Sequence, residues 1–223
     1  MGSDDRPEIA AQRNFRAHRE SLAGLDLGQR FEYIHRHNVW GCDDSVSGTG
    51  STLAETASLR AAIPGLLREI GASSVLDIPC GDFGWLSLVE LGVPYTGADI
   101  VGDLVQANQR RYAGTDRRFV RLDLTADALP AVDLVLCRDC LVHFSYANIG
   151  RALANIRASG ARWLLTTSFP RLETNRDIED GDWRPLNFEK PPFDFAPPDR
   201  VLVENCLEAD GAYNDKSLSL WRL

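Results

Sequence analysis

The stretch VLDIPCGDFGW at residues 75–85 decides the fold of this chain. An apolar strand ends in Asp77 and runs into a turn that contains Gly81 and Gly84, after which we expect a helix over 84–91. Glycines let the backbone approach a ligand closely, and the N-terminus of a helix offers unpaired N–H groups to a polar or anionic group. The stretch therefore predicts a strand, turn and helix that bind a nucleotide-like ligand. The alternative is a turn that only packs a helix tightly on a sheet.

From Ser73 onward, short β-branched apolar runs alternate with helical stretches. This alternation is typical of a mostly parallel sheet covered by helices. Continuous apolar runs such as 134–136 fit strands that are buried on both faces. The pattern predicts strands at 73–78, 95–100, 118–124, 132–138 and 162–169, and further helices at 103–113 and 145–159.

The last part of the chain indicates a lid and a hairpin. Residues 170–199 are dense in proline, aspartate and aromatic residues without a clear period, and such a stretch inside a domain is usually functional or disordered. Its aromatic residues favour an ordered lid. Residues 200–207 and 216–223 flank the turn DGAYND and predict an antiparallel hairpin. We therefore expect a core over 73–223 with the lid as an insertion.

Residues 1–72 are expected to form a helical cap in front of this core. Residues 1–30 carry apolar positions at helical spacing and predict an amphipathic helix or a frayed terminus. The glycine-rich SGTGS at 47–51 predicts a loop. Thr52 opens a capping box for the helix that follows, which Pro64 would kink or divide.

Polar side chains follow four consecutive strands of the expected sheet. Asp99 lies 22 residues after Asp77 and would accept hydrogen bonds from the ribose hydroxyls of an adenosine, while Asp123 would reach the amine of its adenine. The fourth strand is followed by a polar group at 138–143. Because ligands of open α/β sheets bind outside the carboxyl ends of the strands, these groups point to one crevice. Taken singly, each acid could instead be a helix cap.

The segments DIPCGDFGW (77–85), GADI (97–100), RLD (121–123) and CRDCLVHF (137–144) resemble the nucleotide-binding core of class I S-adenosylmethionine-dependent methyltransferases. The resemblance covers about residues 73–169, and the terminal hairpin resembles the reversed last strands of that family. It implies an α/β, Rossmann-like sheet of seven strands in the order 3-2-1-4-5-7-6, with an antiparallel last strand and helices on both faces. It also implies S-adenosylmethionine as the cofactor.

The resemblance also implies the residues that bind the cofactor. Asp77 and Gly81 would line its methionine part, Asp99 would hold the ribose, Asp123 would meet the adenine, and Asp139 would face the methyl group. Trp40 would add a cation–π contact to the sulfonium, or else serve only in packing. The complete expected set is Trp40, Asp77, Pro79, Cys80, Gly81, Asp99, Ile100, Asp123, Leu124, Arg138 and Asp139.

The turn departs from the usual Asp-x-Gly-x-Gly-x-Gly of the family. Pro79 replaces the first glycine, and two residues separate Gly81 from Gly84. A nicotinamide dehydrogenase is disfavoured, because its G-x-G-x-x-G fingerprint is absent and Asp77 would lie close to a pyrophosphate. The segments 38–51 and 175–193 resemble a bacterial subgroup of methyltransferases that act in glycan or secondary metabolism. SGTGS would be an anion-binding nest there, or a plain turn.

The expected chemistry is transfer of a methyl group to oxygen, with nitrogen as the second choice, of a small polar metabolite such as a sugar, nucleoside or carboxylate. The protein then chiefly aligns donor and acceptor. If the acceptor must lose a proton, His143 is the candidate base, although it could also only line the cleft or face solvent. If the acceptor is a carboxylate, Arg138, Arg171 or Arg184 would hold it. The rival hypothesis is a non-catalytic, regulatory nucleoside-binding protein on the same fold.

Composition narrows the partners. Lys and Arg number 24 against 32 Asp and Glu, for a net charge of -8, which disfavours nucleic acid. The sequence has no long apolar run for a membrane, and its five scattered cysteines without a secretory signal favour a reducing cytoplasm. Cys137 and Cys140 with His35 and His37 could suggest zinc, but a second C-x-x-C is missing and we expect no metal. The chain could be a monomer or a homodimer.

Overall fold

A computed structural model describes residues 6–41, 45 and 47–223 of the chain. Residues 1–5 of the expected cap, and residues 42–44 and 46 within the 38–51 segment, lie outside the described residues.

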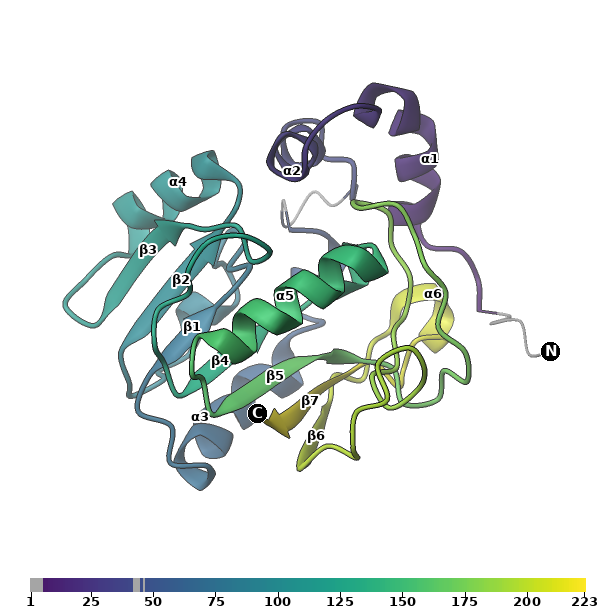
Figure 1. Cartoon of the computed structure of the whole chain (residues 1–223). Coiled ribbons are helices and arrows are strands. Elements are labelled where there is room, and N and C mark those ends of the chain that lie inside the picture. The colour runs from purple at the N-terminus through teal and green to yellow at the C-terminus, as the bar shows by residue number, and fades with distance from the viewer. Residues whose placement is uncertain (1–5, 42–44, 46) are drawn as a thin grey trace.

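The centre of the molecule is one sheet of seven strands in the order β3-β2-β1-β4-β5-β7-β6. Neighbouring strands are parallel except at β7, which runs antiparallel to both β5 and β6 (Figure 1). The strands are β1 (Val75–Asp77), β2 (Tyr95–Asp99), β3 (Arg117–Arg121), β4 (Leu134–Cys137), β5 (Trp163–Ser168), β6 (Arg200–Val203) and β7 (Ser217–Arg222). The order and the reversed strand confirm the expected topology.

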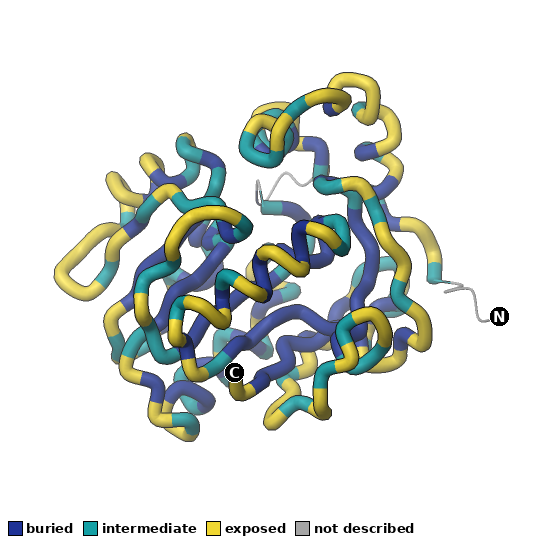
Figure 2. The backbone as a smooth tube through the Cα atoms, in the orientation of Figure 1, coloured by how far each residue is buried: buried dark blue, intermediate teal, exposed yellow. Residues whose placement is uncertain are grey.

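Helices cover both faces of the sheet. They are α1 (Ala10–Leu22), α2 (Leu27–Arg36), α3 (Ala57–Glu69), α4 (Gly102–Tyr112), α5 (Tyr146–Ala158) and the short α6 (Glu208–Gly211). Alternate residues of β1 enter two separate apolar clusters: Leu76 packs in the cluster that contains α1, α2 and α5, and Val75 in the cluster that contains α3 and α4. Because successive side chains of a strand point to opposite faces, the two clusters are the two sides of the sheet. The strands are accordingly buried in the middle (Figure 2).

The prediction of a helix over 84–91 is wrong. Only a 3-10 turn, Leu86–Leu88, follows the glycine turn. Phe83 has a φ of 58°, the Asp82 carboxylate accepts the Gly84 N–H at 2.9 Å, and the Ser87 hydroxyl donates to the Gly84 carbonyl at 2.7 Å. Such local side-chain bonds compete with the backbone bonds of a helix. The glycine turn is therefore followed by a 3-10 turn, and the helix N-terminus expected there is absent.

Other boundaries differ from the sequence expectations. The third strand ends at Arg121, so Asp123 lies in the loop beyond it. Residues 6–30, the described part of this segment, hold one helix and the start of a second, which are separated by Gly24 at a φ of 76°. The expected helix after Thr52 begins only at Ala57, and Pro64 lies inside it without dividing it.

The segment 170–199 is an ordered loop outside the sheet that runs beside α1 and α2 (Figure 1). Arg30 of α2 donates to the carbonyl of Asp180 at 3.0 Å. Arg184 is fully buried and donates to the carbonyls of Leu141 at 2.8 Å and Phe144 at 2.6 Å. Side-chain hydrogen bonds of this kind hold the segment 170–199 in place, because the segment has no helix or strand of its own.

Candidate active site

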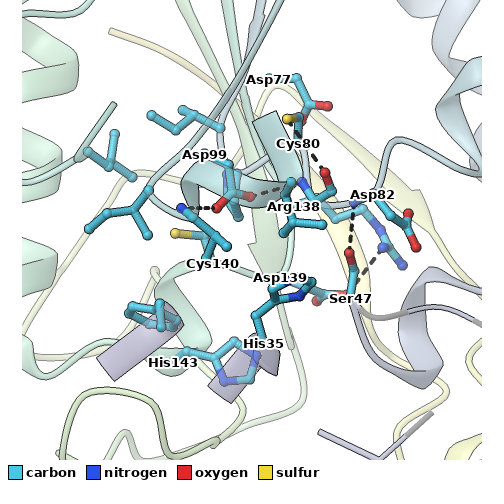
Figure 3. Close-up of a pocket in the computed structure, with 18 of the residues that line it drawn as sticks. His35, Ser47, Asp77, Cys80, Asp82, Asp99, Arg138, Asp139, Cys140 and His143 are labelled. Atoms are coloured by element: carbon cyan, nitrogen blue, oxygen red, sulfur yellow. Dashed lines mark hydrogen bonds and ion pairs between the residues drawn. The ribbon is translucent and has the colours of Figure 1, made fainter. Parts of the chain in front are cut away.

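A cavity of about 960 Å³, its open mouth included, lies at the carboxyl ends of β1, β2 and β4. Figure 3 shows Asp77, Asp99, Arg138, Asp139 and His143 around this hollow. His143 and every expected cofactor-binding residue line it, namely Trp40, Asp77, Pro79, Cys80, Gly81, Asp99, Ile100, Asp123, Leu124, Arg138 and Asp139.

Asp99 is fixed at the end of β2 by the backbone around it. Its carboxylate accepts the N–H of Gly81 at 3.1 Å and the N–H of Val101 at 2.9 Å. Burial raises the pKa of Asp99 to about 6, against the effect of these N–H donors. Each carboxylate oxygen keeps a further lone pair, so Asp99 can still accept hydrogen bonds from a pair of ligand hydroxyls.

Asp77 is the second buried carboxylate of the cavity. The Tyr95 hydroxyl donates to it at 2.6 Å, and burial raises the pKa of Asp77 to about 7, with the nearby Asp99 acting in the same direction. A positive ligand group would favour the ionised form of both acids, whereas a phosphate would add to their repulsion. The electrostatics of this end of the cavity therefore suit a cation.

The loop that contains SGTGS packs against the glycine turn and bonds to it. The Ser47 hydroxyl accepts the N–H of Asp82 at 3.0 Å, and the Ser45 hydroxyl donates to the Asp82 carboxylate at 2.6 Å. Gly81 has a φ of 53°, and a Cβ there would lie 2.3 Å from the Ser47 oxygen. Glycine is thus required at this position by both conformation and space.

Asp123 lines the cavity from the loop beyond β3. Its carboxylate also accepts the N–H and the hydroxyl of Thr125, each at 2.7 Å. These bonds cap a turn, whereas the alternative left by the sequence was a helix cap, and no helix begins at Asp123. The neighbouring Leu124 is buried in the same apolar cluster as α5.

Arg138 lies in a buried network of four charges. Its guanidinium pairs with Glu204 at 2.6 Å and with Asp139 at 3.3 Å, and it donates to the carbonyl of Gly50 at 2.7 Å. Lys216 pairs with Asp139 at 2.6 Å and with Glu204 at 3.5 Å. Buried charges are tolerated when they are paired in this way. To hold an acceptor carboxylate, Arg138 would have to leave these partners.

The other two arginines named as carboxylate clamps are placed elsewhere. Arg184 donates its hydrogen bonds to backbone carbonyls. Arg171 is largely exposed and pairs with Asp215. Neither lines the cavity. The clamp role expected for them is therefore wrong, because the Arg184 guanidinium bonds the turn after β4 and the Arg171 guanidinium pairs with Asp215 just before β7.

His143 lies in the 3-10 turn Leu141–His143 that follows β4. Its Nδ1 is 2.8 Å from the carbonyl of Asp182, and since a carbonyl only accepts, Nδ1 carries the proton. Burial lowers the pKa of His143 to about 4, so the ring is neutral near pH 7 and Nε2 is free to accept a proton. The ring of Trp40 lies 4.5 Å from that of His143, centre to centre.

Sequence reasoning missed Glu204 and Lys216. Each lies next to a strand of the terminal hairpin, and their charges face inward to Arg138 and Asp139. The signal that could have found them is their position: a glutamate and a lysine, each next to a strand of the same hairpin, can pair with each other inside the protein. Trp85 and His35 also line the cavity and were not expected there, and Ser47 lines it from the SGTGS loop.

Comparison with known proteins places the fold. No family model and no curated protein matches the sequence. Among solved structures, Burkholderia thailandensis 1,6-didemethyltoxoflavin-N1-methyltransferase, with S-adenosylhomocysteine bound, is 20% identical with a TM-score of 0.56 over 98% of this chain and 92% of that one. Human N-acetylserotonin methyltransferase, in complex with S-adenosylmethionine, is 12% identical with a TM-score of 0.61 over 94% of this chain and 66% of that one.

The methyltransferase domain of bacterial CtHen1-C is also similar, at 14% identity and a TM-score of 0.54 over 76% of this chain and 98% of that one. The chain therefore has the fold of the class I S-adenosylmethionine-dependent methyltransferases. Within the described residues, no helix has the length and apolarity to cross a membrane, and no group of three or more His, Cys, Asp or Glu side chains is arranged to hold a metal ion.

Proposed function

We propose that this chain is an enzyme that transfers a methyl group from S-adenosylmethionine to oxygen, with nitrogen as the second choice, of a small polar molecule. The observation that carries the proposal is the convergence of Asp77, Asp99 and the Gly81 turn on one cavity. Two buried carboxylates suit a ligand with hydroxyls and positive charge. The fold shared with methyltransferase structures supports the same assignment.

In this proposal each group at the strand ends has a separate task. Asp99, oriented by two backbone N–H groups, accepts the ribose hydroxyls, and Asp77 lies toward the charged methionine part. Asp123 and Leu124 border the adenine. Pro79, Cys80 and Ile100 shape the cavity wall between them. When bound, S-adenosylmethionine supplies a methyl group already activated on a sulfonium.

The remaining residues align the acceptor and exclude water. Trp40 and His143 stack on each other at the cavity wall, and the neutral Nε2 of His143 takes the proton of a hydroxyl acceptor. We also propose that residues 1–72 act as a cap over the cofactor cleft and that 170–199 acts as its lid. Arg30 and Asp180 bond these two parts to each other.

Binding of the reaction product S-adenosylhomocysteine tests the cofactor. A ligand at about 100 times its Kd stabilises the native state by about 2.7 kcal/mol, so we expect its melting temperature to rise by several degrees. NAD should give no rise. Asp99→Ala should abolish the shift, whereas Asp116→Ala, an exposed acid that does not line the cavity, should keep it.

A chain that melts at the same temperature with and without S-adenosylhomocysteine contradicts the proposal. A rise with NAD in its place would point to a dinucleotide site. A nucleoside-binding protein without catalysis would bind S-adenosylhomocysteine yet leave S-adenosylmethionine unconsumed with every acceptor offered.

A further inference from the structure

A second hollow, which we call the aromatic cavity, shares a wall with the cofactor cavity. It encloses about 520 Å³, its open mouth included. Trp40, Ser47, Asp139 and His143 line both hollows. A molecule in the aromatic cavity would therefore meet the proposed base and the proposed methyl donor at this shared wall. The far side, lined by Glu208 and Tyr213, belongs to the aromatic cavity alone.

Three aromatic rings line the aromatic cavity away from the shared wall. Phe169, Trp183 and Tyr213 pack edge to face, with ring centres 5.1 to 6.1 Å apart. All three are buried, and they come from the end of β5, the loop after it and the terminal hairpin. Aromatic walls bind flat rings and cations well. A sugar, in contrast, needs a polar partner for each of its hydroxyls.

The charged residues that line the aromatic cavity are Asp139 and Glu208 against Lys216. Behind its rings, Arg6 lies 5.8 Å from the ring centre of Phe169 and 5.5 Å from that of Tyr213 and pairs with Asp215 at 3.0 Å. Arg138 and Lys216 neutralise Asp139 and Glu204 within one network of contacts between 2.6 and 3.5 Å. Glu208 is left over: in the described part of the chain its half-buried carboxylate makes no hydrogen bond or ion pair. Burial raises the pKa of Glu208, and a positive ligand group beside it would reverse that effect.

We propose that the aromatic cavity holds the methyl acceptor and that this acceptor is a small arylalkylamine with a ring hydroxyl. The ring lies among the aromatic walls, the ammonium group pairs with Glu208, and the hydroxyl lies at the shared wall beside His143. This inference rests on the proposed function. The methyl carbon leaves the sulfonium sulfur, which keeps the bonding electron pair, and bonds to the hydroxyl oxygen, whose proton passes to Nε2 of His143.

A matched series of small phenols tests the inference. Tyramine, 4-hydroxyphenylethanol and 4-hydroxyphenylacetate share the ring and hydroxyl but end in an ammonium, a neutral hydroxyl and a carboxylate. Calorimetry with and without saturating S-adenosylhomocysteine should give the tightest binding for tyramine, about tenfold weaker binding for the alcohol and weaker still for the acid, as expected for one charged pair. Ethanolamine, which lacks the ring, should not bind.

Glu208→Gln should weaken tyramine about tenfold and leave the binding of the alcohol and of S-adenosylhomocysteine unchanged. Glu90→Gln, at an exposed acid that lines neither hollow, is the matched control and should change nothing. If the unsubstituted protein binds the three phenols equally, or prefers 4-hydroxyphenylacetate, that result by itself overturns the inference. If S-adenosylhomocysteine binds while this order fails, only the acceptor class is wrong; if S-adenosylhomocysteine does not bind, the proposed function itself fails.

Discussion

At the scale of single residues, the cavity contains two buried acids that lower the stability of the folded chain when they are ionised. Asp77 and Asp99 are buried acids whose pKa values lie above the ordinary range because burial penalises the ionised form. A group chosen only for stability would not be an acid at these two positions. The cost is understandable if a ligand with positive charge and hydroxyls compensates it when bound.

Asp77→Asn should therefore stabilise the ligand-free protein. A carboxyl whose pKa rises from 3.8 to about 7 binds its proton more readily in the folded state, so stability falls as the pH rises from about 4 to 7. The substitution removes a penalty of up to about 4 kcal/mol at pH 8 and almost none at pH 4. Asparagine keeps an acceptor for the Tyr95 hydroxyl.

Urea unfolding at the two pH values measures this difference, with Asp116→Asn as the control at an exposed acid. A loss of stability at pH 8, or a gain of the same size at pH 4, would show that Asp77 is not buried as a charged group.

At the scale of elements, the strands were predictable and their surroundings were not. The five strands and the terminal hairpin follow from the sequence pattern. The inner strands are apolar because they lie between two helical layers, whereas the edge strands β3 and β6 keep exposed positions. The missing helix at 84–91 depends on Asp82 and Ser87, whose side chains bond the backbone instead of leaving it helical. Periodicity does not report such local bonds.

The candidate site could be predicted to the extent that it lies at strand ends. Asp77 and Asp99 are the last residues of β1 and β2, and Asp139 lies two residues after β4, so the parallel sheet brings them together. Contacts from distant parts of the chain are different. That Lys216 reaches Asp139 and Ser47 reaches Asp82 follows from how the loops fold back, for which the sequence has no local pattern.

The loop after β5 should depend on its buried arginine. Arg184→Ala would remove donors to the carbonyls of Leu141 and Phe144 and leave both acceptors buried. Hydrogen bonds from a charged donor contribute about 1.5–3 kcal/mol each, so we expect a loss of about 3 kcal/mol or more. For a chain of this size that lowers the melting temperature by roughly 6–12 °C.

The matched control is Arg171→Ala in the same loop, whose largely exposed side chain pairs with Asp215. It should change stability by less than about 0.5 kcal/mol. Equal effects of the two substitutions, measured by thermal unfolding, would mean that Arg184 does not anchor the loop.

At the scale of the whole molecule, the sheet carries the apolar core, and the strand ends and loops form the cavities. The two apolar clusters fix the sheet, and the cavities lie at its edge, where strand ends meet the N-terminal helices and the loop after β5. Acids outnumber bases, yet the charges beside the sheet are almost balanced by internal pairing. Under the proposed function the reactants would meet in these cavities, and the fold would leave the choice of acceptor to the loops.

The most direct measurement is a crystal structure of the chain grown with S-adenosylhomocysteine. We expect the ribose hydroxyls within hydrogen-bond distance of the Asp99 carboxylate, the adenine beside Asp123 and the sulfur facing the wall formed by Trp40 and His143. Well-ordered S-adenosylhomocysteine bound anywhere else, with Asp77 and Asp99 remote from it, would contradict the central claim.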